Sequence, residues 1–118
     1  MDAVNKTFDL GFLIDFAHGN EEKLHYYIGI YLKTAARLFG EIESSIDTIS
    51  LEDLYLKVHS LKPQTRYVGI SGLYDLLVNI EDAIKSEEEK ESVIRMALAA
   101  IELNKKGMAE LENYLNGF

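Results

Sequence analysis

Residues 50–68 read SLEDLYLKVHSLKPQTRYV, and this stretch has the pattern of a helix with one buried face. Ser50 is a favoured N-cap residue, and Asp53 three positions later comes close to a capping box. Apolar or small side chains then recur at helical spacing: Leu51, Leu54, Val58, Leu61, Thr65 and Val68. This spacing predicts an amphipathic helix that buries one stripe and exposes the other.

The segments on either side have the same helical character. A short helix is expected over residues 10–17, ending at His18-Gly19. Asn20 is a good N-cap for a long second helix, and the acidic Glu21 and Glu22 suit the positive end of its dipole. That helix would bury Leu24, Tyr27, Ile28, Tyr31, Ala35, Leu38, Ile42 and Ile46.

Two further helices follow the break at Gly69 and Ser71. The first uses Leu73, Leu76, Leu77, Ile80 and Ile84 and ends in the charged stretch 85–91. The last uses Val93, Met96, Ala97, Ala100, Leu103, Met108, Leu111 and Leu115. A single proline and the lack of alternating β-branched segments leave little room for a sheet. We therefore expect an all-α fold, in which residues 1–118 form one antiparallel four-helix bundle with a short N-terminal helix over one end.

Composition limits the function classes. A chain of 118 residues with 47% hydrophobic and 27% charged residues is typical of one globular domain. It has no cysteine, no apolar run near the roughly 20 residues of a membrane span, and no signal-peptide pattern. A cytoplasmic location is expected. The net charge of −8 argues against binding to nucleic acid or to an anionic membrane.

The charge is unevenly spread along the chain. No carboxylate lies between Asp53 and Asp75, whereas Lys57, Lys62 and Arg66 do. A positive window in an acidic protein is a candidate docking site for an anionic group. The alternative is chance patterning of a solvated surface.

Several common site chemistries are missing. The chain has no glycine-rich phosphate loop, no GxSxG and no HExxH motif. His18 and His25 lack cysteine support and read as polar surface residues rather than metal ligands. A metal-dependent helical-bundle enzyme would need Glu-x-x-His pairs, and Glu22 to His25 is one copy only. We rank that enzyme last among the alternatives.

His59 is the strongest candidate for a functional residue. On an ideal helix its side chain points about 130° away from the buried seam, toward solvent. Lys62, Pro63 and Arg66 follow at helical spacing and share its face. Two cations beside an imidazole would oppose its protonation but would stabilise a phosphoryl group attached to the ring. The pattern fits a phosphorylated histidine, although surface histidines are also common for no special reason.

The stretch Leu54-Tyr-Leu-Lys-Val-His-Ser-Leu-Lys62 resembles the phosphoacceptor helix of histidine-containing phosphotransfer (HPt) domains. The likeness continues through Val68-Gly69-Ile70, then Leu73, Leu76, Leu77 and Ile80-Glu81, and more loosely upstream in residues 16–22. It implies that His59 accepts the phosphoryl group, that Lys62 steadies its oxygens, and that Gly69 marks a turn. It also implies a monomer without catalytic activity or cofactor of its own. Such a protein relays phosphate between the receiver domains of a hybrid sensor kinase and a response regulator, and only the receivers hold Mg²⁺.

One departure from the family pattern is Pro63, which stands where the family usually has glycine. Proline inside a helix removes a backbone donor, so we expect a kink there rather than a helix end. Gln64 could also donate to the phosphoryl group, but it lies about 140° from His59 on an ideal helix. The alternative function is a scaffold module of HPt shape that accepts no phosphate.

A receiver domain needs a partly apolar surface around the histidine. The expected partner contacts are Tyr55, Pro63, Gly69, Tyr26 and Ile30. Tyr26 and Ile30 point away from the buried seam of the long helix. For these two, packing under the first short helix is an equally good interpretation.

Overall fold

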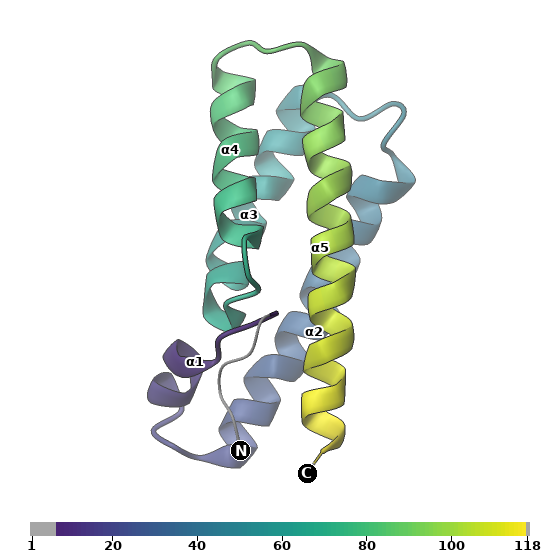
Figure 1. Cartoon of the computed structure of the whole chain (residues 1–118). Helices are drawn as coiled ribbons and strands as arrows, with labels where there is room; N and C mark the ends of the chain where they lie inside the picture. Colours follow the sequence, from purple (N-terminus) through teal and green to yellow (C-terminus); the bar gives the residue numbers. More distant parts are fainter. Residues whose placement is uncertain (1–6, 118) are drawn as a thin grey trace.

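The computed structural model describes residues 7–117, and in this range the protein is all-helical. Its elements are α1 (Gly11–Phe16), α2 (Glu21–Ser44), α3 (Leu51–Val68), α4 (Leu73–Lys85) and α5 (Lys90–Asn116) (Figure 1). No strand forms within residues 7–117. The expected all-α class and the expected order of one short and four longer helices are confirmed.

Local capping chemistry sets the helix starts that the sequence predicts. Asn20 Oδ1 accepts a hydrogen bond from the Lys23 backbone N–H at 3.0 Å, and Ser50 Oγ accepts one from Asp53 at 3.0 Å. Each bond satisfies one of the backbone donors that a helix start leaves unpaired. Both predicted N-caps are therefore confirmed.

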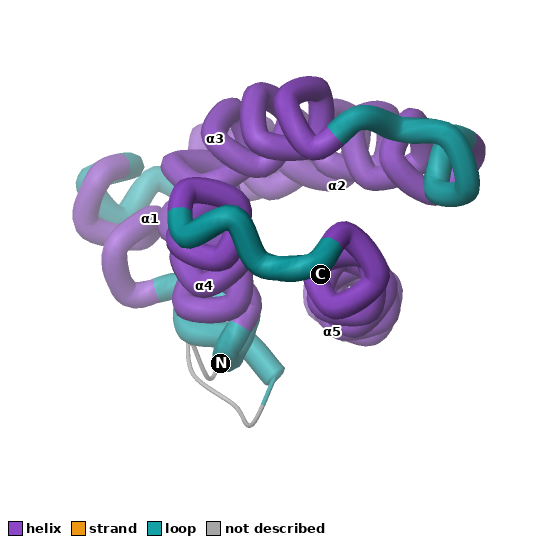
Figure 2. The backbone as a smooth tube through the Cα atoms, turned by 90° about the horizontal axis from the view of Figure 1, so that it is seen from above, coloured by secondary structure: helices purple, strands orange, loops and turns teal. Residues whose placement is uncertain are grey.

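The four longer helices lie along one axis of an elongated molecule measuring 44 × 23 × 21 Å. Successive long helices run in alternating directions (Figure 1), and in the view from above α2 and α3 lie together on one side, with α4 and α5 on the other (Figure 2). Helix α3 contacts both α2 and α4, and α5 contacts α4 and α2. Helix α1 packs against α2 and α3 at one end of the molecule, as the sequence predicts.

The buried stripe of α3 matches the predicted seam closely. Leu54, Val58, Leu61, Thr65 and Val68 are at most 1% exposed, whereas Leu51 in the first turn is half-buried. These side chains form part of one continuous core with the other helices. Because α3 is held along this whole stripe, its opposite face is a rigid platform.

The prediction for α2 was wrong in detail near its end. Phe39 is buried at 4% exposure, whereas the predicted core residue Leu38 is only half-buried. Ile46 lies beyond the helix, which ends at Ser44. From Ala35 the inward stripe continues at the i+4 step to Phe39, and the i+3 step to Leu38 falls at its edge.

A polar pair lies inside the core between α2 and α5. The Tyr31 hydroxyl donates to Asn104 Oδ1 at 2.6 Å, and Asn104 Nδ2 lies 3.0 Å from Met108 Sδ. Burial raises the pKa of the Tyr31 phenol well above its usual value, so the hydroxyl stays protonated and acts as a donor. The sequence pattern marked Tyr31 as core but did not indicate Asn104.

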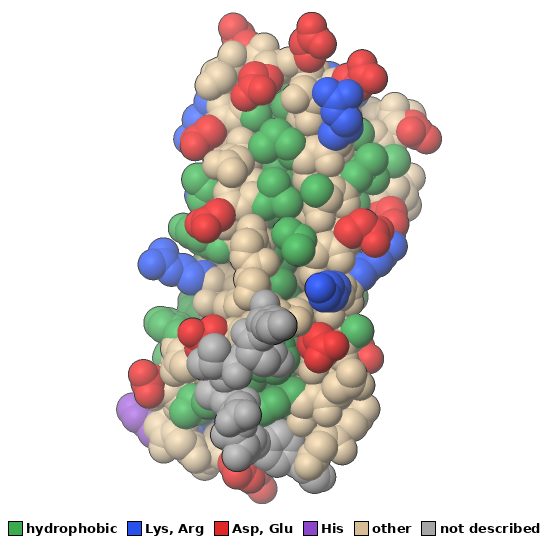
Figure 3. All heavy atoms as spheres, viewed as in Figure 1, with side chains coloured by type: hydrophobic (Ala, Val, Ile, Leu, Met, Phe, Trp, Pro, Cys, Tyr) green, Lys and Arg blue, Asp and Glu red, His purple; other side chains and the backbone are tan. Residues whose placement is uncertain are grey.

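Charged side chains cover the outer surface in the view of Figure 3, and hydrophobic ones are visible mainly along the line between α4 and α5. Among the helices of residues 7–117, none combines the length and the apolar character that crossing a bilayer requires.

Candidate functional site

The His59 side chain is exposed on a rigid helix. Its exposed fraction is 65%, while the neighbouring Val58 and Leu61 are fully buried. The packed stripe fixes the backbone of α3, and the ring projects from the opposite side. The predicted outward orientation of His59 is confirmed.

A buried carboxylate from the next helix holds both His59 and Lys62. Glu81 on α4 has a side chain only 5% exposed, and its Oε2 lies 2.9 Å from His59 Nδ1. Its other oxygen, Oε1, accepts a hydrogen bond from Lys62 Nζ at 2.7 Å. One carboxylate therefore engages two residues that lie one helical turn apart on α3.

This contact decides where the imidazole carries its proton. An ionised carboxylate only accepts hydrogen bonds, so His59 Nδ1 must donate to Glu81. In the neutral ring the lone pair then belongs to Nε2. Nε2 is the nitrogen that this contact leaves available to a visiting group.

The protonation state of Glu81 follows from three competing influences. Burial by itself would raise the pKa of Glu81. Hydrogen bonds from Lys62 and His59, together with the positive charge of Lys62, outweigh burial and lower the pKa below its usual value. The same hydrogen bond raises the pKa of Lys62. The pair is therefore ionised near neutral pH.

Glu81 also reduces the positive charge of the window formed by residues 54–74. The charge of Lys62 is balanced by a carboxylate that residues 54–74 do not contain, so the window is less positive than its sequence suggests. In the sequence, Glu81 stood out only as the end of the HPt-like pattern and was not predicted as a site residue. A signal was available: Glu81 lies four residues after Leu77, on the apolar stripe of α4, where an ionisable side chain needs a partner.

Tyr55 borders His59 one turn earlier on α3, as predicted. The two rings are nearly parallel, with centroids 6.1 Å apart and planes 7° apart. Lys85 Nζ lies 5.6 Å from the centroid of the Tyr55 ring, a cation–π arrangement. Tyr55 thus limits the orientation of the imidazole on one side.

The two remaining phosphoryl-binding candidates point elsewhere. The guanidinium of the exposed Arg66 lies 5.2 Å from the centroid of the Tyr74 ring. Gln64 Nε2 donates to the Ser60 carbonyl at 3.2 Å, and Gln64 lines a groove beside α2. Of the four candidates, the structure brings only His59 and Lys62 onto one shared partner.

Pro63 is exposed and lies inside α3, which continues beyond it to Val68. The expectation that proline does not end this helix is confirmed. Nearby carbonyls gain side-chain donors: Thr65 Oγ1 donates to the Lys62 carbonyl at 2.9 Å, and Gln64 to that of Ser60. The carbonyl that loses its helical donor to Pro63 is that of His59, four residues earlier.

Gly69 forms the predicted turn, and the chain's own N-terminal segment packs against it. Its φ of +57° is left-handed, and a Cβ there would lie 2.3 Å from the Asp9 carbonyl oxygen. The Asp9 N–H donates to the Gly69 carbonyl at 3.0 Å. Asp9 therefore packs directly against the half-buried Gly69, and a partner contact at Gly69 stays a prediction.

Tyr26 and Ile30 remain accessible, with exposed fractions of 65% and 43%. Neither is buried under α1. Tyr26 packs edge-on against Tyr27 with ring centroids 5.7 Å apart, and Ile30 lines the same groove as Gln64. Packing under the first helix is excluded for both residues.

Metal ligation finds no support in the described part of the chain. Residues 7–117 contain no group of three or more His, Asp or Glu side chains placed to hold a metal ion. His18 is exposed in the turn after α1, and His25 lies within α2.

Comparisons with known proteins add no relative to this picture: no family model matches the chain, and searches of curated proteins and of solved structures find no match.

Proposed function

We propose that the protein is a histidine phosphotransfer module, in which α2–α5 act as an antiparallel four-helix bundle and His59 carries a phosphoryl group. The group would pass between the receiver domains of a hybrid sensor kinase and a response regulator. The observation that carries this proposal is the exposed imidazole whose Nδ1 is held by the buried Glu81 carboxylate.

The chemistry follows from that arrangement. The Nε2 lone pair of neutral His59 attacks the phosphorus of an aspartyl phosphate in line. A phosphorus–nitrogen bond forms, the bond from phosphorus to the aspartyl oxygen breaks, and the receiver recovers its carboxylate. The ring keeps its Nδ1 proton and becomes cationic, and Glu81 stabilises that charge at 2.9 Å. Mg²⁺ would belong to the receiver.

Lys62 supplies the second interaction. A phosphoryl group on Nε2 carries close to two negative charges. Lys62 Nζ already lies beside the same carboxylate that His59 contacts, and its side chain is 21% exposed. A small rotation would bring its ammonium from Glu81 toward a phosphoryl oxygen. Reversibility follows, because the cationic ring is a good leaving group when a second receiver attacks.

The surface of α3 beside His59 suits a transient partner, since Tyr55, Pro63 and Arg66 lie at helical spacing on the same side. Tyr26 and Ile30 are accessible apolar side chains on the neighbouring helix α2. A receiver covering this area would reach the histidine without any change in the helices. We further propose a cytoplasmic, monomeric protein that needs no cofactor of its own.

A second candidate is a scaffold of the same shape that accepts no phosphate. Two observations favour it: Pro63 stands beside the histidine where the resembled family has glycine, and Lys62 is already paired with Glu81. The two candidates differ in one measurable respect, which is whether His59 becomes labelled.

The experiment mixes the protein with radiolabelled, kinase-phosphorylated receiver domains. Phosphotransfer predicts an acid-labile, base-stable label on the protein, which disappears in His59→Gln. His18→Gln is the matched control, because it removes another exposed histidine and should keep the label. Label that persists in His59→Gln, or no label with any receiver of the host, refutes the proposal and favours the scaffold.

A further inference from the structure

A groove lies between α1, α2 and α3, on a face of α3 adjacent to the one that carries His59. Its volume is about 410 Å³, within the range of small-molecule sites. The lining residues are Leu13, Phe16, Tyr27, Ile30, Tyr31, Thr34, Gln64, Tyr67 and Val68.

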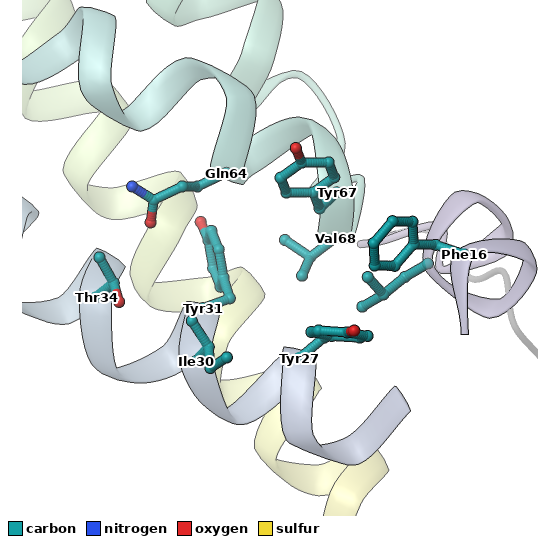
Figure 4. A pocket seen from close by; sticks show the side chains of 9 residues that line it. Phe16, Tyr27, Ile30, Tyr31, Thr34, Gln64, Tyr67 and Val68 are labelled. Carbon is teal, nitrogen blue, oxygen red and sulfur yellow. The ribbon is translucent and has the colours of Figure 1, made fainter. Parts of the chain in front are cut away.

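The walls of the groove are largely aromatic and its floor belongs to the core. Tyr27 and Ile30 on α2 face Gln64 and Tyr67 on α3, and Phe16 closes one end (Figure 4). Val68 and Tyr31 at the floor are only 1% and 4% exposed. A flat ring can enter such a slot and stack on these side chains, whereas a helix of a partner protein would rest on the rim.

Among residues 7–117, no charged side chain lines the groove. A charged group placed there would lose its water without gaining an ionic partner, which is costly. The lining therefore favours a ligand whose part inside the groove is uncharged.

Gln64 is one of the polar side chains that line the groove, together with Thr34 and the tyrosine hydroxyls. Gln64 Nε2 is committed to the Ser60 carbonyl at 3.2 Å. In Figure 4 the amide oxygen of Gln64 lies on the groove side, beside the hydroxyl of Tyr31. Within residues 7–117 no donor uses this oxygen. A ligand N–H or O–H at this end would gain a partner on binding.

We propose that this groove binds a small, uncharged, flat aromatic ligand that carries one N–H or O–H donor. Its ring stacks among Tyr27, Tyr31 and Tyr67, and its donor bonds to Gln64 Oε1. The groove shares no side chain with the His59–Lys62–Glu81 cluster, so ligand binding goes beyond phosphotransfer and does not require it. Its wall residue Ile30 also belongs to the surface proposed for the receiver.

Indole is a suitable probe, because it is flat, uncharged and has one N–H. Titration into ¹⁵N-labelled protein should give saturable shifts in the amide signals of the lining residues. 1-Methylindole, which lacks the donor, should bind about threefold to tenfold more weakly. Indole-3-acetate, which carries a charge, should also bind more weakly than indole. In Gln64→Leu the difference between indole and 1-methylindole should disappear.

Ile30→Glu places a charge on the groove wall and should weaken indole binding at least tenfold. Leu98→Glu is the matched control, since Ile30 and Leu98 are 43% and 42% exposed, and Leu98 lies on α5 away from the groove. His59→Gln should bind indole as the wild type does, so a failure of phosphotransfer leaves this test intact.

Four results would overturn the proposal. Shifts that never saturate, or that scatter over the surface, exclude a defined site. An equal loss of indole affinity in Ile30→Glu and Leu98→Glu excludes the groove as the binding site. Equal affinity for indole and 1-methylindole excludes the role of Gln64. Concentration-dependent self-association of the wild type that Ile30→Glu abolishes assigns the groove to a second copy of the chain.

Discussion

Glu81 Oε2 lies 2.9 Å from His59 Nδ1, although the two residues are 22 positions apart and belong to different helices. The carboxylate is buried and ionised, so it determines which ring nitrogen holds the proton. The Glu81 carboxylate on α4 thus leaves the lone pair of the neutral imidazole on His59 Nε2.

The first prediction concerns this contact in phosphotransfer. Glu81→Gln keeps the shape and a hydrogen-bond acceptor but removes the negative charge that faces the cationic ring. Transfer from a phosphorylated receiver should slow by about tenfold or more. Rapid-quench measurement of label on His59 tests this, with Glu102→Gln, an exposed carboxylate on α5, as the control. An unchanged rate in Glu81→Gln would mean that the carboxylate is only structural.

The second prediction concerns acid stability. The pKa of Glu81 is lowered in the folded state, so its stabilisation is present above the usual pKa of 4.5 and is lost as the pH falls through the lower folded value. At pH 7 the wild type should exceed Glu81→Gln by about 1–3 kcal/mol in free energy of unfolding.

Urea unfolding of both proteins at several pH values measures that difference. It should begin to shrink near pH 4.5, where the carboxylate of the unfolded chain takes up a proton, and should be smallest below the lower pKa of the folded protein. A difference that stays constant down to acid-unfolding conditions would show that the Glu81 charge does not contribute.

The third prediction concerns the turn after α3. Gly69→Ala combines a left-handed backbone with a Cβ 2.3 Å from the Asp9 carbonyl oxygen, and it should cost about 3 kcal/mol or more. Gly72→Ala is the control, since its φ of +77° is also left-handed but its Cβ would meet nothing within 4 Å. It should cost about 1 kcal/mol. Equal losses in thermal or urea unfolding would contradict the packing of Asp9 on Gly69.

The fourth prediction concerns the buried pair of α2 and α5. Tyr31→Phe removes the hydroxyl that donates to Asn104 and should destabilise the protein by about 1–3 kcal/mol. Adding Asn104→Leu removes the acceptor left without its donor, so the double variant should be more stable than the sum of the single changes predicts. Strict additivity in a double-mutant cycle would show that the two side chains are not energetically coupled.

Much of the helical architecture was predictable because it depends on short-range rules. The caps at Asn20 and Ser50 act on backbone groups within one turn, and the stripe from Leu54 to Val68 repeats at helical spacing. The exposure of His59 followed from the same periodicity. Phe39 and Leu38 were exchanged because two adjacent apolar residues at the edge of a stripe look alike in sequence.

The five helices and the outward face that carries His59 and Lys62 were predictable, because helix periodicity depends on residues three and four positions apart. Three further contacts appear only in the folded protein: Glu81 lies under that face, Asp9 packs on Gly69, and Gln64 lines a groove with Tyr27 and Tyr31. These contacts join distant segments, and their geometry depends on how the helices pack. The proton position on His59 is therefore a property of the packed helices and not of the α3 sequence.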